Sequence, residues 1–314
     1  MEVSFVIPLF NCLPLTQAMV ASLQATLPAG LSHEIILVDD GSTDGTRAWL
    51  ATLRAPFRVV LNERNLGYAT ANNRGAALAH GDLLALLNND LVLPPGWFEP
   101  LLAAHRTLGS RAGLVGNVQL SIPSGAVDHA GMFVNVKGKL EHVRLNPSPL
   151  ARWLHPVRPS VAVTGACVLL ERALWQQLGG FDEGYVNGSE DVDLCFRAAQ
   201  LGRINAVALR SVIRHHVSAS PQRKARDEEN TRRLTHRWRA ELVAGIDRAW
   251  CWRYLEAHWL NSRDPADHAA ARQVLAYVLH LRSTPPAEAA RAFNAALDAE
   301  FARWDSLLGS QALA

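Results

Sequence analysis

Residues 34–46 read EIILVDDGSTDGT, and this stretch decides the fold class. Four consecutive apolar residues run without interruption into two aspartates and a glycine. A strand with no polar residue of its own is buried on both faces, as strands of parallel sheets are. The stretch therefore predicts a central strand whose carboxyl end presents Asp39, followed by a turn into a helix.

Strand and helix patterns alternate along the sequence before and after this strand. We expect further strands at residues 3–9, 58–61, 83–87 and from 114 onward, and helices at 15–27, 46–53, 68–79 and from about 97 to 108. Strand–helix–strand connections are right-handed almost without exception. The pattern predicts an α/β fold with an open, mostly parallel sheet flanked by helices.

The later part of the chain changes character twice. Residues 121–160 carry scattered prolines and predict loops with short β pieces, before strands at 161–170, 203–207 and 209–213 and helices at 172–178 and 190–201. Residues 222–314 are rich in Arg, Ala, Leu and Trp, which predicts three or four helices broken at Pro285–Pro286. We expect a catalytic α/β domain over 1–220 and a helical extension over 221–314.

Composition excludes several classes of protein. The 314 residues are 49% hydrophobic with a formal charge of +2, which excludes a disordered chain and a dedicated nucleic-acid binder. The four cysteines lie far apart, so neither a disulfide framework nor a zinc knuckle is expected. The sequence shows neither a basic leader nor an apolar stretch of membrane-spanning length. We therefore expect a cytoplasmic protein.

Polar side chains follow three of the expected strands. These clusters are PLFN at 8–11, DDGS at 39–42 and NND at 88–90. Ligands of open α/β sheets bind beyond the carboxyl ends of the strands, so the three clusters predict one binding rim. Thr43 and Asp44 fit helix capping better than ligand binding.

A second acidic cluster, EDVD at 190–193, begins a helix and precedes His215 and His216. Acids in a first helical turn also stabilise the helix dipole, which explains part of this cluster. Carboxylates combined with one imidazole favour Mn²⁺ or Mg²⁺ over zinc. Adjacent strand residues face opposite sides, so we expect His215 rather than His216 to reach the site.

The sequence lacks the phosphate-loop pattern GxxxxGK[ST], a GxGxxG after the first strand, and a GxSxG elbow. These absences argue against an NTPase, a dinucleotide-dependent dehydrogenase and an α/β-hydrolase. Six blocks instead resemble the inverting family 2 glycosyltransferases of the GT-A fold, in the branch of bacterial rhamnosyl-, galactofuranosyl- and N-acetylhexosaminyl-transferases. The blocks are SFVIPLFN, IILVDDGSTDGT, NLGYATANNRG, LLNNDLVLPPGW, TGACVLLER with GGFDE, and EDVDLCFRAAQLGR with HHVSAS.

The resemblance implies a donor site for a UDP- or dTDP-sugar. It assigns nucleotide contacts to the first strand, the DDGS turn and the helix at 68–79, and places residues 88–90 at the position of a variant DxD motif. The donor-binding residues are Pro8, Asn11, Asp39, Asn72, Asn88 and Asn89. Asp90 would be the main ligand of Mn²⁺ or Mg²⁺, and His215 would complete the metal site. Asp191 would be the general base for the acceptor hydroxyl, with Glu190 as the alternative.

Other interpretations stay open at this point. A non-catalytic nucleotide-sugar-binding or scaffold protein is the main alternative. A sugar-phosphate nucleotidyltransferase is disfavoured, because this chain has no Gly-rich, basic loop after the first strand. The small residues Gly165 and Ala166 fit either close approach of the donor sugar or ordinary strand packing. The basic, Trp-rich segment 222–260 favours a packed helical bundle, with peripheral contact at the inner membrane face and homodimer formation as alternatives.

Overall fold

The computed structural model describes residues 2–216, 226–259 and 265–309. The chain forms two compact units, Met1–Met132 with His142–Arg226, and Phe133–Glu141 with Asp227–Ala314. The expected boundary after residue 220 falls at 217–225, outside the described residues. The helical unit includes the short segment Phe133–Glu141 from the middle of the chain.

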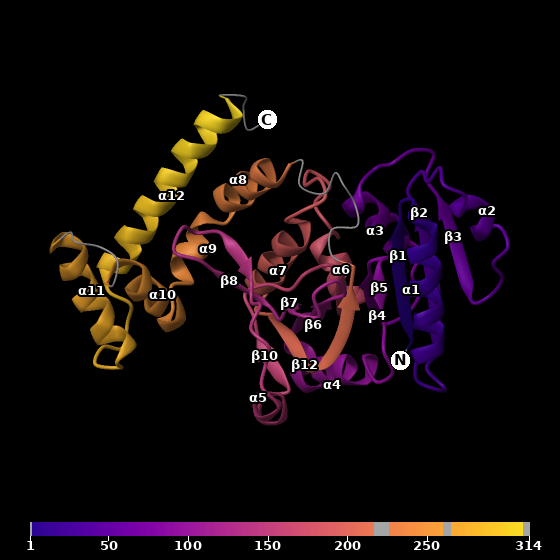
Figure 1. Ribbon diagram of the computed structural model, residues 1–314, viewed down its shortest axis with the longest axis horizontal. Helices are drawn as coiled ribbons and strands as arrows, with labels where there is room; N and C mark the ends of the chain where they lie inside the picture. Colours follow the sequence, from indigo (N-terminus) through magenta and orange to yellow (C-terminus); the bar gives the residue numbers. More distant parts are fainter. Residues whose placement is uncertain (1, 217–225, 260–264, 310–314) are drawn as a thin grey trace. The chain divides into compact units, whose positions relative to one another are not determined.

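The first unit is built on one large mixed sheet (Figure 1). Its strand order is β10-β12-β6-β11-β4-β1-β2-β3, with β5 paired to β12 and β7 paired to β6. The strands are β1 (Val3–Leu9), β2 (His33–Asp39), β3 (Phe57–Leu61), β4 (Leu83–Leu87), β5 (Leu91–Val92), β6 (Ala112–Ser121), β7 (Val127–His129), β10 (Val157–Pro159), β11 (Cys167–Glu171) and β12 (Ile204–His215).

Helices connect and cover these strands. They are α1 (Leu13–Thr26), α2 (Thr46–Leu50), α3 (Tyr68–Ala77), α4 (Phe98–Leu108), the 3₁₀ turn Gly109–Arg111, α5 (Pro149–Leu154), α6 (Arg172–Leu178) and α7 (Glu190–Gln200). The core packs α1 and α4 against the sheet through fully buried side chains, among them Phe5, Trp97 and Phe98. This packing confirms the expected α/β architecture.

Several expectations about the later strands were wrong in detail. Residues 161–166 are not strand, and β11 begins only at Cys167 and runs antiparallel to β4. The two short strands expected at 203–207 and 209–213 are one strand, β12, with a register shift between Ala208 and Val212. An apolar run reveals burial but neither strand direction nor a bulge, because both depend on distant partners.

The described part of the second unit holds five helices rather than three or four. They are α8 (Asp227–Arg237), α9 (Arg239–Ala244), α10 (Arg248–His258), α11 (Pro265–Val278) and α12 (Ala287–Leu308), together with most of a small sheet of β8 (Met132–Val134) and β9 (Leu140–His142). The break at Pro285–Pro286 is confirmed between α11 and α12.

Tryptophans of the basic segment pack inside this helical unit. Trp238 and Trp250 are buried, and the indole N–H of Trp250 donates to the Asn135 carbonyl at 3.1 Å. Trp252 is exposed. The burial supports the bundle interpretation for two of the four tryptophans. No helix among the described residues has both the length and the apolarity needed to span a membrane.

Candidate functional site

The expected binding rim forms where β1, β2 and β4 end side by side. These strands are parallel, with Leu9 opposite Asp39 and Val6 opposite Leu86. The polar residues that follow them therefore leave the sheet at the same edge. Pro8 is half-buried at the end of β1, and its contact with a nucleotide stays a prediction.

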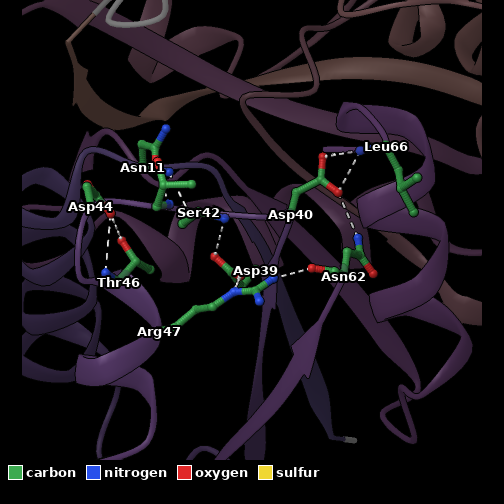
Figure 2. Close-up of polar contacts among 10 residues, drawn as sticks. Asn11, Asp39, Asp40, Ser42, Asp44, Thr46, Arg47, Asn62 and Leu66 are labelled. Carbon is green, nitrogen blue, oxygen red and sulfur yellow. Dashed lines mark hydrogen bonds and ion pairs between the residues drawn. The ribbon is translucent and has the colours of Figure 1, made fainter. Parts of the chain in front are cut away.

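The two aspartates of the DDGS turn are both held by the protein itself, as Figure 2 shows. Asp39 is fully buried, accepts from the backbone N–H of Ser42 and pairs with Arg47 at 2.8 Å. Asp40 accepts from the Asn62 side chain and from the backbone of Leu66 and Gly67, at 2.7–3.0 Å. A ligand contact of Asp39 stays a prediction.

Asp40 lies in the predicted DDGS rim cluster, but its structural role was not predicted from the sequence. Its carboxylate fixes the loop 62–67, which leads into α3 and hence to Asn72. Gly41 lets the loop 62–67 lie directly against the DDGS turn, since a Cβ at position 41 would lie 2.6 Å from the Arg64 carbonyl carbon. Its φ of +84° also favours glycine. In the sequence, this role is marked by the doubled aspartate before Gly41.

The tip of β1 is tied to the same turn. Asn11 accepts from the backbone N–H of Thr43 through Oδ1, and its own N–H donates to Ser42 Oγ, both at 2.8 Å. Asp44 accepts from the N–H and hydroxyl of Thr46 and from the N–H of Leu13. Asp44 thus bonds the first residue of both α1 and α2, although the residue in the N-cap position of α2 is Gly45 rather than Asp44.

Asp90 and His215 come together although 125 positions separate them. β5 pairs antiparallel with β12, which places Leu91 opposite His215, and the His216 N–H donates to the Asp90 carbonyl at 3.1 Å. His215 Nε2 then lies 3.1 Å from Asp90 Oδ1, and the histidine is buried. The strand pairing thus selects His215, not His216, as the side chain beside Asp90.

This corner fits a divalent cation. Within the described residues, Asn88 Oδ1 and His215 Nδ1 are buried without a hydrogen-bond partner. One carboxylate and one imidazole suit Mn²⁺ or Mg²⁺, which take oxygen and nitrogen ligands. No group of three His, Cys, Asp or Glu side chains able to hold a metal occurs in residues 2–216, 226–259 and 265–309. The roles of Asp90 and His215 as metal ligands stay a prediction.

Residues 164–166 join this corner to the acidic helix. The Asn88 N–H donates to the Ala166 carbonyl at 2.8 Å, and the Gly165 N–H donates to Asp191 Oδ2 at 2.7 Å. The Gly165 carbonyl accepts from the Tyr68 hydroxyl at 2.8 Å. Each of these bonds uses the main chain of residues 165 or 166, so this non-strand segment links the corner to α3 and α7 through its backbone.

The three acids at the start of α7 differ in environment. Asp191 is half-buried, and its second oxygen accepts from the Val192 N–H at 2.8 Å. Glu190 is buried and accepts from the Gly188 N–H at 2.7 Å. Asp193 is fully buried and paired with Arg197 at 2.7 Å. Of the two carboxylates expected to be the base, Asp191 has the greater solvent access.

His129 is a residue that sequence reasoning missed. It is fully buried on β7, 3.3 Å from His142 between the Nδ1 atoms, and its Nε2 faces the Thr164 N–H at 3.5 Å. Burial holds its pKa well below the ordinary value, and the charges of His142, Arg158 and His215 add to this. A neutral imidazole therefore borders the 164–166 segment.

The other two asparagines expected in the site, Asn89 and Asn72, form hydrogen bonds within the protein. The Asn89 side chain donates to Thr16 on α1 at 2.9 Å, so it has a structural partner. Asn72 is fully buried in α3 and donates to the Tyr68 carbonyl at 2.9 Å, while its Oδ1 has no hydrogen-bond partner within the described residues. The ligand contacts of both asparagines stay predictions.

Comparison with known proteins now places the chain. The family model described as Glycosyl transferase family 2 matches residues 4–130. An N-acetylglucosaminyl-diphospho-decaprenol L-rhamnosyltransferase of Mycobacterium tuberculosis is 32% identical over 213 residues, which are 60% of this chain and 68% of that protein. O-antigen biosynthesis protein RfbC of Myxococcus xanthus is 33% identical over 232 residues, or 70% of this chain. The chain belongs to glycosyltransferase family 2.

The aligned region spans only 18% of the length of RfbC. Among solved structures, that of GalNAc-T7 with UDP, GalNAc and Mn²⁺ is similar, with a TM-score of 0.60 and 19% sequence identity over 85% of this chain and 54% of that chain. This likeness concerns the fold, and it identifies the first unit's architecture as GT-A, as the sequence motifs predicted.

Proposed function

We propose that this chain is an inverting glycosyltransferase that moves a sugar from a UDP- or dTDP-sugar to an acceptor hydroxyl on a glycan, a lipid-linked saccharide or a protein glycan. The observation that carries the proposal is the pairing of Asp90 with His215 at 3.1 Å, joined through residues 164–166 to Asp191. The M. tuberculosis relative, an N-acetylglucosaminyl-diphospho-decaprenol L-rhamnosyltransferase, supports this class of reaction.

In this proposal Asp90 and His215 hold Mn²⁺ or Mg²⁺. The cation, when bound, would offset negative charge that develops on the leaving nucleoside diphosphate. Asn88 contributes its buried Oδ1 beside the same corner, where an amide oxygen lacks any other partner within the described residues. Removal of either ligand would therefore weaken nucleotide binding only in the presence of metal.

Asp191 acts as general base in this scheme. The acceptor hydroxyl must lose a proton as its oxygen attacks the anomeric carbon, and a carboxylate is a suitable acceptor for it. The Gly165 and Val192 N–H groups orient the Asp191 carboxylate, so its direction is set before substrate binds. Glu190 is more buried, and we assign it to support of the loop through Gly188.

Calorimetric titration with UDP and dTDP, with and without MnCl₂, tests the metal corner. We expect Asp90→Ala to lose the metal-dependent part of the affinity, because a direct ligand is removed. Asp305→Ala on α12 is the matched control, since Asp305 is an exposed aspartate of the helical unit. Equal wild-type affinity with and without metal would contradict the proposal.

Turnover with a panel of sugar nucleotides and acceptors tests the reaction itself. The product linkage, read by NMR, should have the anomeric configuration opposite to that of the donor. Retention of configuration would contradict the inverting assignment. Metal-dependent nucleotide binding without transfer to any acceptor would favour the non-catalytic binding protein instead.

A further inference from the structure

Large apolar side chains project from a short arm of the α/β unit. Four large apolar side chains here are more than half exposed: Leu145 (77%), Leu150 (63%), Trp153 (68%) and Leu154 (52%). We call these four residues the α5 patch. Three of them lie on α5 and the fourth in the loop before it. Monomeric soluble proteins seldom expose grouped large apolar side chains without a function for them.

The local structure holds this patch outward. Ser148 caps α5 by accepting from the Ala151 N–H at 3.1 Å, and Pro149 occupies the first helical position. Arg210 of β12 donates to the carbonyls of Arg152 and Trp153 at 3.0 and 3.2 Å, which anchors the end of α5 to the sheet. Figure 1 shows α5 projecting beside β10 and β12.

The stretch of sequence that carries the patch is basic. Residues 142–170 contain three arginines and no aspartate or glutamate. Arg152 and Arg210 hydrogen-bond to main-chain carbonyls, and neither has an ion-pair partner among the described residues. Only Arg144 approaches an acid, Asp128, at 3.8 Å. Such a surface complements an anionic one.

We propose that the α5 patch docks the α/β unit on an anionic lipid bilayer. Trp and Leu beside Arg are the composition of interfacial membrane anchors, in which the apolar side chains enter the headgroup region and the cations contact lipid phosphates. Arg210, which anchors the end of α5, precedes His215 by five positions on β12, or about 17 Å of strand length.

Membrane contact was expected in the basic, Trp-rich segment 222–260, and the α5 patch is a different surface. Two of the four tryptophans of that segment are buried, whereas Trp153 is the most exposed tryptophan among the described residues. The docking proposal does not depend on sugar transfer, because vesicle binding requires neither donor nor acceptor.

Co-sedimentation with vesicles tests the proposal. We expect wild type to bind vesicles of phosphatidylcholine with about 30 mol% phosphatidylglycerol, and to bind pure phosphatidylcholine at least about tenfold more weakly. Trp153→Ser should weaken binding to the anionic vesicles about tenfold or more, because it removes one large inserted side chain. Arg144→Gln should weaken it a few-fold, and only with anionic vesicles.

Trp252→Ser is the matched control, since Trp252 is exposed on α10 of the helical unit. It should bind vesicles as wild type does, and all variants should keep the wild-type melting temperature. Loss of binding in Trp252→Ser but not in Trp153→Ser would overturn the proposal, as would absence of wild-type binding. A wild-type dimer that Trp153→Ser dissociates, without vesicle binding, would instead identify the patch as a contact between two copies of the chain.

Discussion

Replacement of Asp191 by asparagine separates catalysis from stability at the proposed base. Both carboxylate oxygens accept main-chain N–H groups, from Gly165 at 2.7 Å and from Val192 at 2.8 Å. Asparagine has one acceptor oxygen, so its amide N–H₂ must face one of these donors. One charge-assisted hydrogen bond is therefore lost, at a cost of about 1.5–3 kcal/mol in the free energy of unfolding.

The effect on turnover should be larger than this cost. A general base contributes roughly 10²–10⁴-fold to the rate, which corresponds to about 3–5 kcal/mol in the activation free energy. Because an assay below the melting temperature samples folded protein, the stability cost does not itself lower kcat. We expect Asp191→Asn to keep nucleotide affinity and to lose at least about a hundredfold in kcat.

Asp193→Asn provides a matched control on the same helix. It removes the charge that faces Arg197, inside the protein and away from solvent, so it should cost about 2–4 kcal/mol of stability. Its kcat should stay within a few-fold of wild type. The measurements are urea denaturation and steady-state release of nucleoside diphosphate. Asp191→Asn with near wild-type kcat, or equal losses in both variants, would refute the assignment, and an inactive Glu190→Gln beside an active Asp191→Asn would move the base to Glu190.

Three further changes test other parts of the site. His215→Ala should impair metal-dependent nucleotide binding far more than His216→Ala, since only His215 Nε2 lies beside Asp90, and calorimetry giving the reverse ranking would contradict the pairing of β5 with β12. Gly41→Ala should lower the free energy of unfolding by about 2–5 kcal/mol, because it combines positive φ with a 2.6 Å clash, and a wild-type urea midpoint would argue against it. Burial keeps His129 neutral in the folded protein, whereas in the unfolded chain it has an ordinary pKa near 6.5, so its contribution to the free energy of unfolding is complete above that pH. Below pH 6.5 the free energy of unfolding should fall by up to about 1.4 kcal/mol per pH unit. His129→Gln should flatten this dependence in urea titrations between about pH 7 and pH 5.

The rim at β1, β2 and β4 could be predicted because its signals are local. Each strand is a short apolar run followed at once by polar residues, and parallel neighbours end at one edge. The role of Asp40 could not be predicted in the same way. Which aspartate holds the loop 62–67 depends on contacts made more than twenty positions away.

The α5 helix could not be predicted from the sequence for a different reason. Ser148 and Pro149 are typical of the first positions of a helix. The scattered prolines of residues 121–160 nevertheless favour a loop over the segment as a whole. A six-residue helix has too few positions for an apolar period to appear. Its exposed Trp153 and Leu154 became informative only once burial was known, because sequence alone does not separate an inner from an outer apolar face.

Main-chain geometry explains why small residues stand at the centre of the site. A Cβ on Gly165 would lie 3.0 Å from the Tyr68 hydroxyl and 3.3 Å from the Asp191 Cβ. Both contacts are tighter than an ordinary Cβ contact, so a side chain at this position would have to displace Tyr68 or Asp191 slightly, whatever the donor sugar needs. Thr164 faces His129, Gly165 holds Asp191 and Ala166 holds Asn88, so three consecutive residues orient three different parts of the site. A displacement of this segment would therefore move the proposed base and the metal corner together rather than one alone.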